Sequence, residues 1–288
     1  MTAKEWFQKA QAEGFAIGAF NIDSLEIFKG VLTAAKNKKS PVIVEFSPGE
    51  VGYFGLRNIV DMVVNARDEY QIPILLNLDH GKKVEDCQAA VDQAGFDNVH
   101  FDGSSLEFSD NVQSTRKVVA AAHSKGLLVE GEVDKFPGES EVNSEELNLE
   151  LIKTSYTDPK KAIRFVEETK VDIFAAFFGN VHGTYPTQPD LDIALLTNIR
   201  EVLPNTFLSL HGGSGISAEQ VKRSIQVGKI VKVNVNTELR QVYRDAVEEK
   251  LGEEPKEYKV YEYADSVILA VASVVEEKID VFGSGGKI

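Results

Sequence analysis

The sequence contains little of what marks several classes of protein. Its single cysteine, Cys87, cannot form an intrachain disulfide, which fits a reducing compartment. The longest apolar stretch near its end, residues 267–275, is shorter than a membrane span, and the charged segment 1–14 has no apolar core of signal-peptide length. Lysine and arginine number 31 against 45 aspartates and glutamates, and the net charge of −14 argues against nucleic acid or an anionic membrane as a partner. We therefore expect a soluble, cytoplasmic protein.

Short apolar runs and helical segments alternate along the 288 residues, of which 43% are hydrophobic. Eight runs bounded by turn residues are predicted strands, at 15–21, 41–47, 72–80, 98–104, 127–133, 172–180, 206–213 and 230–237. Helical periodicity fills most of the intervals, with clear examples at 24–39, 83–95, 110–126, 158–170 and 217–229. Strands that are apolar on both faces and alternate with helices indicate a parallel sheet covered by helices.

Eight such units fit a closed barrel better than an open sheet. A doubly wound sheet would more often carry a glycine-rich loop after its first strand, whereas this chain continues there as FNIDSLE, residues 20–26. We therefore predict an α/β fold, a (β/α)8 TIM barrel in a single domain of residues 1–288. An extended active-site loop is expected after the fifth strand, and a helical extension at the C-terminal end.

Polar side chains gather where the predicted strands end. In a parallel barrel the carboxyl ends of all strands open onto one face, so these residues converge in space. They are Asn21, Ser47, Asp79 with His80, Asp102, Glu132, His182, His211, and Asn234 with Thr237. Three of the five histidines lie at these ends, and we interpret the other two, His100 and His123, as ordinary core or surface residues.

Three imidazoles from separate strands, with carboxylates nearby, suit a divalent ion such as zinc. Three neutral nitrogen ligands leave one coordination position open, which is typical of a catalytic site. Asp102 and Glu132 would either hold a second, looser cation or orient the imidazoles. The alternative is that each histidine merely ends its strand, which needs three independent coincidences on one face.

Glycine and amide residues form a second group after the sixth, seventh and eighth strands, in FGNVHG (178–183), LHGGSG (210–215) and KVNVNT (232–237). Such loops present backbone N–H groups to an oxyanion, and helices that start near Ser217 and Thr237 add their positive ends. Barrels commonly bind phosphate in this region. The alternative is that these glycines only make tight turns. However, His182 and His211 each adjoin a glycine of these loops. The predicted metal site and the predicted anion site would therefore lie side by side.

Together with LNLDHG, VHFDGSSLEFSDNV, VEGEV and the C-terminal FGSGGKI, these motifs resemble the class II, metal-dependent fructose-bisphosphate aldolases and their tagatose-bisphosphate relatives over nearly the whole chain. The resemblance implies that His80, His182 and His211 bind catalytic zinc and that Asp79 carries the proton of the aldol hydroxyl. It implies an alternative metal position, for a second cation, at Asp102 and Glu132. It also implies contacts to the phosphate and hydroxyls of dihydroxyacetone phosphate from Gly183, Gly212, Gly213, Ser214, Asn234, Asn236 and Thr237, with Ser47 and Asn21 as outer contacts.

The chemistry agrees with this assignment. Cleavage of a carbon–carbon bond β to a hydroxyl leaves an enediolate, which a Lewis acid stabilises without a covalent intermediate. The other route needs a Schiff-base lysine, and the sixth strand, DIFAAFFGN, has none. Lys232 on the eighth strand would instead offer charge near the phosphate or form a buried ion pair.

A second proton must move at C3 of dihydroxyacetone phosphate. The long acidic segment 134–157 is a predicted lid, and by resemblance Glu139 or Glu141 is the candidate base. This chain departs from the family pattern here, because Asp134 and Pro137 stand in EVDKFPG where glycines are expected. The alternative is that 139–157 is a solvated acidic run.

We therefore predict a zinc-dependent aldolase that cleaves a ketose 1,6-bisphosphate, most simply fructose 1,6-bisphosphate, to dihydroxyacetone phosphate and glyceraldehyde 3-phosphate. Tagatose 1,6-bisphosphate is the first alternative substrate. A barrel metallohydrolase and a non-catalytic sugar-phosphate binder are further alternatives. The resemblance also implies a homodimer or homotetramer.

Overall fold

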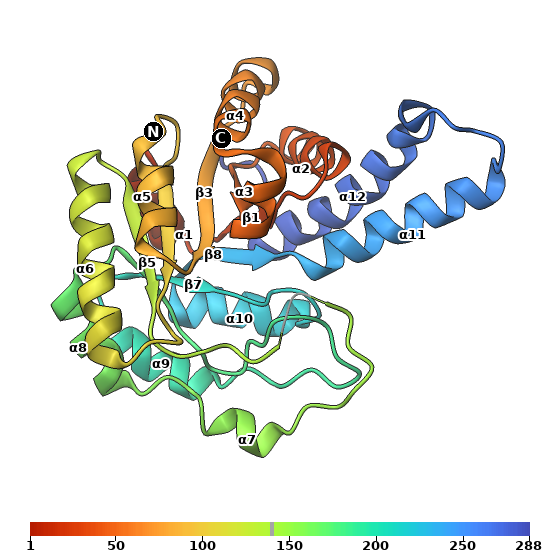
Figure 1. Cartoon of the computed structure of the whole chain (residues 1–288). Coiled ribbons are helices and arrows are strands. Elements are labelled where there is room, and N and C mark those ends of the chain that lie inside the picture. Colours follow the sequence, from red (N-terminus) through yellow and green to blue (C-terminus); the bar gives the residue numbers. More distant parts are fainter. Residues whose placement is uncertain (139–140) are drawn as a thin grey trace.

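Eight parallel strands close into a barrel in which each strand pairs with its neighbours in sequence and the first strand pairs with the last. The computed structural model describes residues 1–138 and 141–288 and is shown in Figure 1. The strands are β1 (Ile17–Asn21), β2 (Val42–Phe46), β3 (Ile74–Gly81), β4 (Asn98–Asp102), β5 (Leu128–Glu132), β6 (Ile173–Ala175), β7 (Phe207–Leu210) and β8 (Ile230–Val235). The prediction of a (β/α)8 barrel is confirmed.

Twelve helices are present in the described part of the chain, and they surround and extend the barrel (Figure 1). They are α1 (Ala3–Glu13), α2 (Leu25–Lys38), α3 (Pro48–Phe54), α4 (Leu56–Tyr70), α5 (Val84–Asp92), α6 (Phe108–Ser124), α7 (Leu149–Lys153), α8 (Pro159–Thr169), α9 (Ile193–Val202), α10 (Ala218–Gly228), α11 (Thr237–Glu253) and α12 (Val260–Phe282). The side chains of Ser24, Asp158 and Ser217 cap α2, α8 and α10, because each accepts a hydrogen bond from a backbone N–H of the first turn. None of these helices is long and apolar enough to cross a membrane.

The sixth strand is shorter than predicted. It ends at Ala175, although the apolar run continues to Phe178. The Asn180 side chain accepts a hydrogen bond from the N–H of Phe178 and donates to the carbonyls of Ala176 and His211, so it holds residues 176–180 in a buried, irregular turn. The amide therefore satisfies backbone groups that a longer strand would have paired with its neighbours.

The amino-terminal end of the barrel is apolar and closed by α1. Trp6 and Phe7 of this helix pack against residues at or near the starts of strands, in a cluster with Ile17, Ile43, Leu75, Leu128, Ile173, Phe207 and Val231. Phe7 meets Phe207 edge to face at 5.6 Å between ring centroids. At the other end of the barrel the chain leaves β8 into α11, which runs outward beside α12 (Figure 1).

Candidate active site

The carboxyl ends of the strands surround a cavity of about 380 Å³. Most of the residues predicted at this face line it, namely Asn21, Ser47, Asp79, His80, Asp102, Glu132, His182, Gly183, His211, Gly212, Ser214, Asn234, Asn236 and Thr237. Gly213 does not line the cavity, because it packs on β8, where its N–H donates to the carbonyl of Asn234 at 2.9 Å. Glu141 has an exposed side chain outside the lining, and Glu139 lies outside the described residues.

A backbone irregularity brings Asp79 and His80 into the same cavity. Consecutive residues of a regular strand point to opposite faces, so two neighbours would not normally share a site. The pairing of β3 with β4 shifts between Leu78 and Gly81, and His80 has a left-handed backbone with φ of 47°. A non-glycine residue seldom adopts this conformation, and such strain collects at functional sites. The bulge therefore explains how an apolar strand can end in two groups that act together.

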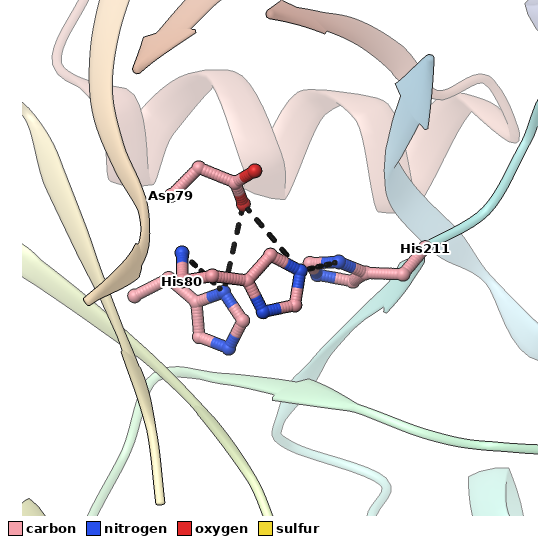
Figure 2. A group of neighbouring side chains, drawn as sticks. Asp79, His80 and His211 are labelled. Atoms are coloured by element: carbon pink, nitrogen blue, oxygen red, sulfur yellow. Dashed lines mark hydrogen bonds and ion pairs between the residues drawn. The ribbon is translucent and has the colours of Figure 1, made fainter. Parts of the chain in front are cut away.

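The imidazoles of His80 and His211 lie close enough to share one ion. His80 Nε2 and His211 Nδ1 are 3.1 Å apart, and Figure 2 shows both rings together with Asp79. Two nitrogens on one tetrahedral zinc would lie about 3.3 Å apart. The His182 ring is centred 5.1 Å from that of His80 and 6.1 Å from that of His211. The three histidines predicted at strand ends therefore meet at one place.

The closest group of possible ligand atoms differs from the predicted one. Asp79, His80, His100 and His211 have ligand atoms within 4.8 Å of one another, as do His80, Asp102 and Glu132. His182 lies beside these groups but belongs to neither. His100, interpreted above as an ordinary core or surface residue, is buried inside the cluster, where its Nδ1 accepts a hydrogen bond from the His80 N–H at 3.3 Å.

The signal that could have found His100 is alternation. His100 and Asp102 are two apart in β4 and therefore point to the same side, into the barrel. The same spacing relates Asn77 to Asp79, Glu130 to Glu132, Ser209 to His211, and Lys232 to Asn234. The last residues of the strands alone do not reveal this second layer, which consists of the polar side chains two positions earlier in each strand: Asn77, His100, Glu130, Ser209 and Lys232.

The second layer fixes His211. Its Nε2 lies 2.8 Å from Glu130 Oε1, and Lys232 Nζ donates to Glu130 Oε2 at 2.7 Å. Lys232 therefore forms a buried ion pair with Glu130 rather than a phosphate contact; it also lies 3.3 Å from Glu45, and all four side chains are fully buried. Glu130 therefore orients the His211 ring so that Nδ1 faces His80. Burial lowers the pKa of His211 to about 4, which keeps the imidazole neutral, as a metal ligand must be.

Buried atoms that lack a hydrogen-bond partner in the described structure indicate a cation-binding site among His80, His100, Asp102 and Glu132. Glu132 Oε2 and His100 Nε2 are buried without a hydrogen-bond partner in the described structure, although they lie 3.4 Å apart. Asp102 Oδ2 lies 3.3 Å from His80 Nδ1, and its other oxygen accepts hydrogen bonds from Ser104. Burial raises the pKa of Glu132 to about 7. A divalent ion among these nitrogens and carboxylate oxygens would satisfy groups that the protein leaves unpaired, so the residues fit a metal.

Asp79 is held as a carboxylate by its surroundings. The amides of Asn21 and Asn234 donate to its two oxygens at 3.2 and 3.3 Å. Burial alone would raise the pKa of Asp79, but His80 and His100 hold it below its ordinary value. Burial alone would likewise lower the pKa of His80, yet Asp79 and Asp102 raise it. The carboxylate and the imidazoles are thus electrostatically coupled.

The rim at β6, β7 and β8 offers unpaired backbone donors. The N–H groups of Gly183, Gly212 and Ser214 make no hydrogen bond within the described residues. Gly212 has φ of +64°, and a Cβ there would lie 2.1 Å from the carbonyl oxygen of Val181, so only glycine fits. The 17-residue helix α11 begins beside these groups at Thr237, which lines the cavity. Free N–H groups beside a helix N-terminus form a site for an oxyanion.

Phe136 is a further lining residue that the sequence did not single out. Its ring stacks on His211 at 5.6 Å and lies 5.3 Å from that of His182, measured between centroids. It stands in EVDKFPG, at the start of the predicted lid. An aromatic ring at this point excludes water from one side of the imidazoles.

Comparison with known proteins supports the same chemistry. The sequence matches the family described as "Fructose-bisphosphate aldolase class-II" over residues 1–287. It is 38% identical to a fructose-bisphosphate aldolase of Geobacillus stearothermophilus, covering 100% of this chain and 98% of that protein. It is 37% identical to a 6-phospho-5-dehydro-2-deoxy-D-gluconate aldolase of Shouchella clausii, covering 96% and 92%.

Solved structures agree. The crystal structure of the YdjI aldolase from Escherichia coli K12 superposes with a TM-score of 0.84 at 32% identity, covering 99% of this chain and 97% of that one. A putative fructose-1,6-bisphosphate aldolase from Coccidioides immitis gives a TM-score of 0.86 at 29% identity, with the same coverage. The match over the whole length and the identities above 30% confirm the resemblance seen in the motifs: the chain belongs to the class-II fructose-bisphosphate aldolase family and is an aldolase.

Proposed function

We propose that this aldolase uses zinc to cleave a ketose 1,6-bisphosphate reversibly, most simply fructose 1,6-bisphosphate, to dihydroxyacetone phosphate and glyceraldehyde 3-phosphate. The observation that carries the proposal is that His80, His182 and His211 meet beside the buried carboxylate of Asp79 in one cavity. These three histidines would hold the zinc ion, which when bound would supply Lewis-acid stabilisation of the negative charge that develops on the substrate.

Asp79 is the proposed proton carrier. In cleavage it accepts the proton of the C4 hydroxyl, and in condensation it returns that proton. Its lowered pKa means that it is ionised and ready to accept. Asn21 and Asn234 donate to its oxygens, so we assign these amides to orienting the carboxylate as well as to the substrate contacts expected from the sequence.

The phosphate of the dihydroxyacetone end is proposed to bind at the N–H groups of Gly183, Gly212 and Ser214, beside the start of α11. Asn236 and Thr237 line the same part of the cavity. The Ser47 N–H already donates to Glu50 at 2.6 Å, which leaves its hydroxyl as the group available to substrate. Gly213, whose N–H is bonded to β8, supports the turn.

Glu139 or Glu141 is the proposed base for the C3 proton. The backbone of residues 141–143 pairs with Thr184, close in sequence to His182, which ties this loop to the site. The exposed side chain of Glu141 would reach the cavity only after the loop moved, as lids do on substrate binding. Asp102 and Glu132 are proposed to hold a second cation position on the β4–β5 side.

One relative favours a second candidate substrate. The Shouchella clausii protein is named for 6-phospho-5-dehydro-2-deoxy-D-gluconate and is nearly as similar as the fructose-bisphosphate aldolases. That compound is a phosphorylated ketone whose far end is a carboxylate instead of a phosphate. Tagatose 1,6-bisphosphate, which differs from the fructose compound only at C4, remains a third.

A substrate panel tests the proposal. Purified protein is given fructose 1,6-bisphosphate, tagatose 1,6-bisphosphate and the deoxygluconate phosphate, and triose phosphate release is followed before chelation, after chelation, and after zinc is restored. We expect cleavage that chelator removes and zinc restores, with the highest kcat/KM for the fructose compound. Cleavage that survives chelation would remove zinc from the mechanism. No cleavage of any ketose phosphate by the zinc-loaded protein would favour a metallohydrolase or a non-catalytic binder.

Two further inferences rest on the sequence. We propose a cytoplasmic location, because the single cysteine is buried and unpaired, and a homodimer or homotetramer, because of the family resemblance. Light scattering coupled to gel filtration measures the oligomeric state, and a monomeric mass would exclude this inference.

A further inference from the structure

The bulge at the end of β3 faces a single residue of β4. Between the paired positions of the two strands, β3 has two residues, Asp79 and His80, whereas β4 has only His100. A bulge of this kind leaves one residue of the longer strand without a regular partner in the ladder of hydrogen bonds. The N–H of His80 donates to the Nδ1 atom of the His100 side chain at 3.3 Å. The residue opposite the bulge therefore supplies an acceptor to the bulge through its side chain.

The His100 ring lies between three groups of the site. The ring is fully buried, so bulk water cannot supply partners for its two nitrogens. Because Nδ1 accepts the His80 N–H, the ring proton is placed on Nε2. Nε2 faces Glu132 Oε2 at 3.4 Å, and Nδ1 lies 3.6 Å from Asp79 Oδ1. One side chain thus lies beside the backbone of a proposed metal ligand, the proposed proton carrier and a carboxylate of the second cation position.

The backbone of His80 needs this support. Its φ of 47° lies in the left-handed region, where a residue other than glycine persists only when the surrounding structure holds it. The next residue is packed closely, since a Cβ on Gly81 would lie 2.7 Å from Cys87 Sγ and 3.1 Å from the carbonyl oxygen of His100. The hydrogen bond from the His80 N–H to His100 holds the strained residue itself. The direction of the His80 imidazole therefore depends on His100.

The use of Nδ1 distinguishes two roles for His100. His100 belongs to the group with Asp79, His80 and His211 whose possible ligand atoms lie within 4.8 Å of one another. A ligand nitrogen needs a free lone pair, but the lone pair of Nδ1 is directed at the His80 N–H, and Nε2 carries the ring proton. His100 therefore acts on a bound ion through its neighbours rather than by contact with the ion.

We propose that His100 is a positioning residue, which sets the His80 imidazole and the Asp79 carboxylate in the active site by accepting the His80 N–H. The inference rests on the proposed function for the roles of these two side chains, and it adds the residue that holds them. Without the acceptor, a buried N–H would lack its partner. The strand would relax toward a regular conformation, in which His80 and Asp79 point to opposite faces.

Three substitutions separate the two nitrogens of the ring. In His100→Asn the side-chain oxygen can take the place of Nδ1 as acceptor, whereas in His100→Gln the side-chain amide can take the place of Nε2. His100→Leu removes both groups and keeps an apolar side chain in the buried position. His123→Leu is the matched control, because His123 is an exposed histidine of α6 that pairs with Asp172 outside the site.

Two measurements test the proposal without any substrate. The dissociation constant of zinc is measured by competition with a chelator. Exchange of the His80 N–H with solvent deuterium is followed by NMR in the chelated protein. Labelling with ¹³C-carbonyl aspartate and ¹⁵N-histidine identifies this amide, because residues 79 and 80 form the only Asp-His step in the sequence.

We expect His100→Leu to weaken zinc binding about 10- to 100-fold and to speed exchange of the His80 N–H about tenfold or more. His100→Asn should restore both quantities to within about threefold of wild type, whereas His100→Gln should resemble His100→Leu. Ketose cleavage by the zinc-saturated variants should follow the same order, with the loss in kcat rather than in KM. His123→Leu should match wild type in every measurement.

Zinc affinity and exchange at the wild-type level in His100→Leu would overturn the proposal. Equal losses in all three variants would also overturn it, because they would assign the whole ring to packing or to the metal. If His100→Leu fails to fold, the comparison of His100→Asn with His100→Gln still distinguishes these outcomes. Neither zinc affinity nor exchange depends on cleavage, so a wild-type protein that shows the expected pattern but cleaves no ketose phosphate would contradict the proposed function and not the positioning role.

Discussion

The two ends of the barrel are built from the same eight strands but differ in chemistry. At the amino-terminal end, strand residues such as Ile17 and Ile173 pack with Trp6 and Phe7 of α1 in an apolar cluster. At the carboxyl end, the same strands finish in histidines, carboxylates and amides around a cavity. The first end is closed and apolar, so it contributes to stability. The second has buried polar atoms that find no partner in the described part of the chain, which lowers stability but creates binding capacity.

A paired polar layer separates these ends. Both oxygens of Glu45 and both of Glu130 have partners, which include Asn77, Lys232 and Ser209. One layer higher, Glu132 and His100 each retain a buried atom that has no hydrogen-bond partner among the described residues. Among the buried carboxylates, those of Glu45 and Glu130 are fully paired and that of Glu132 is not, which marks the level at which the structural interior becomes the site. We therefore predict that mutations at the carboxyl end change metal binding and turnover, whereas mutations at the amino-terminal end change the free energy of unfolding.

The largest effect is expected at the metal cluster. His211→Ala removes a ring nitrogen that lies 3.1 Å from His80, so bound zinc and activity should be lost together, with kcat/KM falling about 10³-fold or more. Zinc content and triose phosphate release check this. His123→Ala is the control, since His123 lies on α6 and pairs with Asp172. A His211→Ala protein that keeps zinc and turnover would contradict the metal assignment.

Asp79→Asn separates proton transfer from metal binding at the same end. The amide keeps the shape of the side chain but cannot accept the hydroxyl proton, so turnover should fall about 10²- to 10⁴-fold while zinc content stays at the wild-type level. Metal analysis and steady-state kinetics measure the two effects. Simultaneous loss of zinc would assign Asp79 to the metal instead, a role that its position 4.0 Å from His80 Nε2 makes geometrically available.

Phe7→Ala tests the opposite end. This buried ring contacts Phe207 and has no path to the cavity except through the barrel, so its removal should lower the free energy of unfolding by about 3–5 kcal/mol. Activity of the folded protein should be unchanged. Denaturant unfolding and kcat/KM measured well below the melting transition provide the comparison. A parallel loss of kcat/KM would show that the two ends are coupled.

The last effect, at most about 1.4 kcal/mol for each pH unit, is a pH dependence of stability that arises in the layer between the ends. Burial, together with Asp79, raises the pKa of Glu45 from 4.5 to about 8, although Lys232 and Asn77 oppose the shift. The folded state then holds a proton that the unfolded state releases, so the stability of the chelated protein should fall as pH rises from about 4.5 through about 8, by at most about 1.4 kcal/mol per pH unit. Glu45→Gln should flatten this slope in urea unfolding, and an unchanged slope would exclude Glu45 as its source.

Much of the site was predictable because periodicity determines where strands end. The alternation of strands and helices predicts the barrel. Because the carboxyl ends of all strands in such a barrel open onto one face, His182 and His211 are predicted to lie together. The limits of β6 were not predictable, because the Asn180 side chain bonds both to Ala176 nearby and to His211, 31 residues away, and these hydrogen bonds decide where pairing stops. Nor was the role of His100 evident, because a histidine within a strand is ambiguous until the neighbouring strands place Glu132 and Asp79 beside it.

The sequence by itself determined the order of strands, the polar composition of their carboxyl ends and the family to which the chain belongs, because these depend on local patterns and motifs. Only the tertiary structure decided which of these polar groups are paired. The bulge that turns His80 toward Asp79 and the pairing of Lys232 with Glu130 both depend on contacts between segments far apart in the chain. Such contacts arise from the register of the closed barrel, which no single segment encodes.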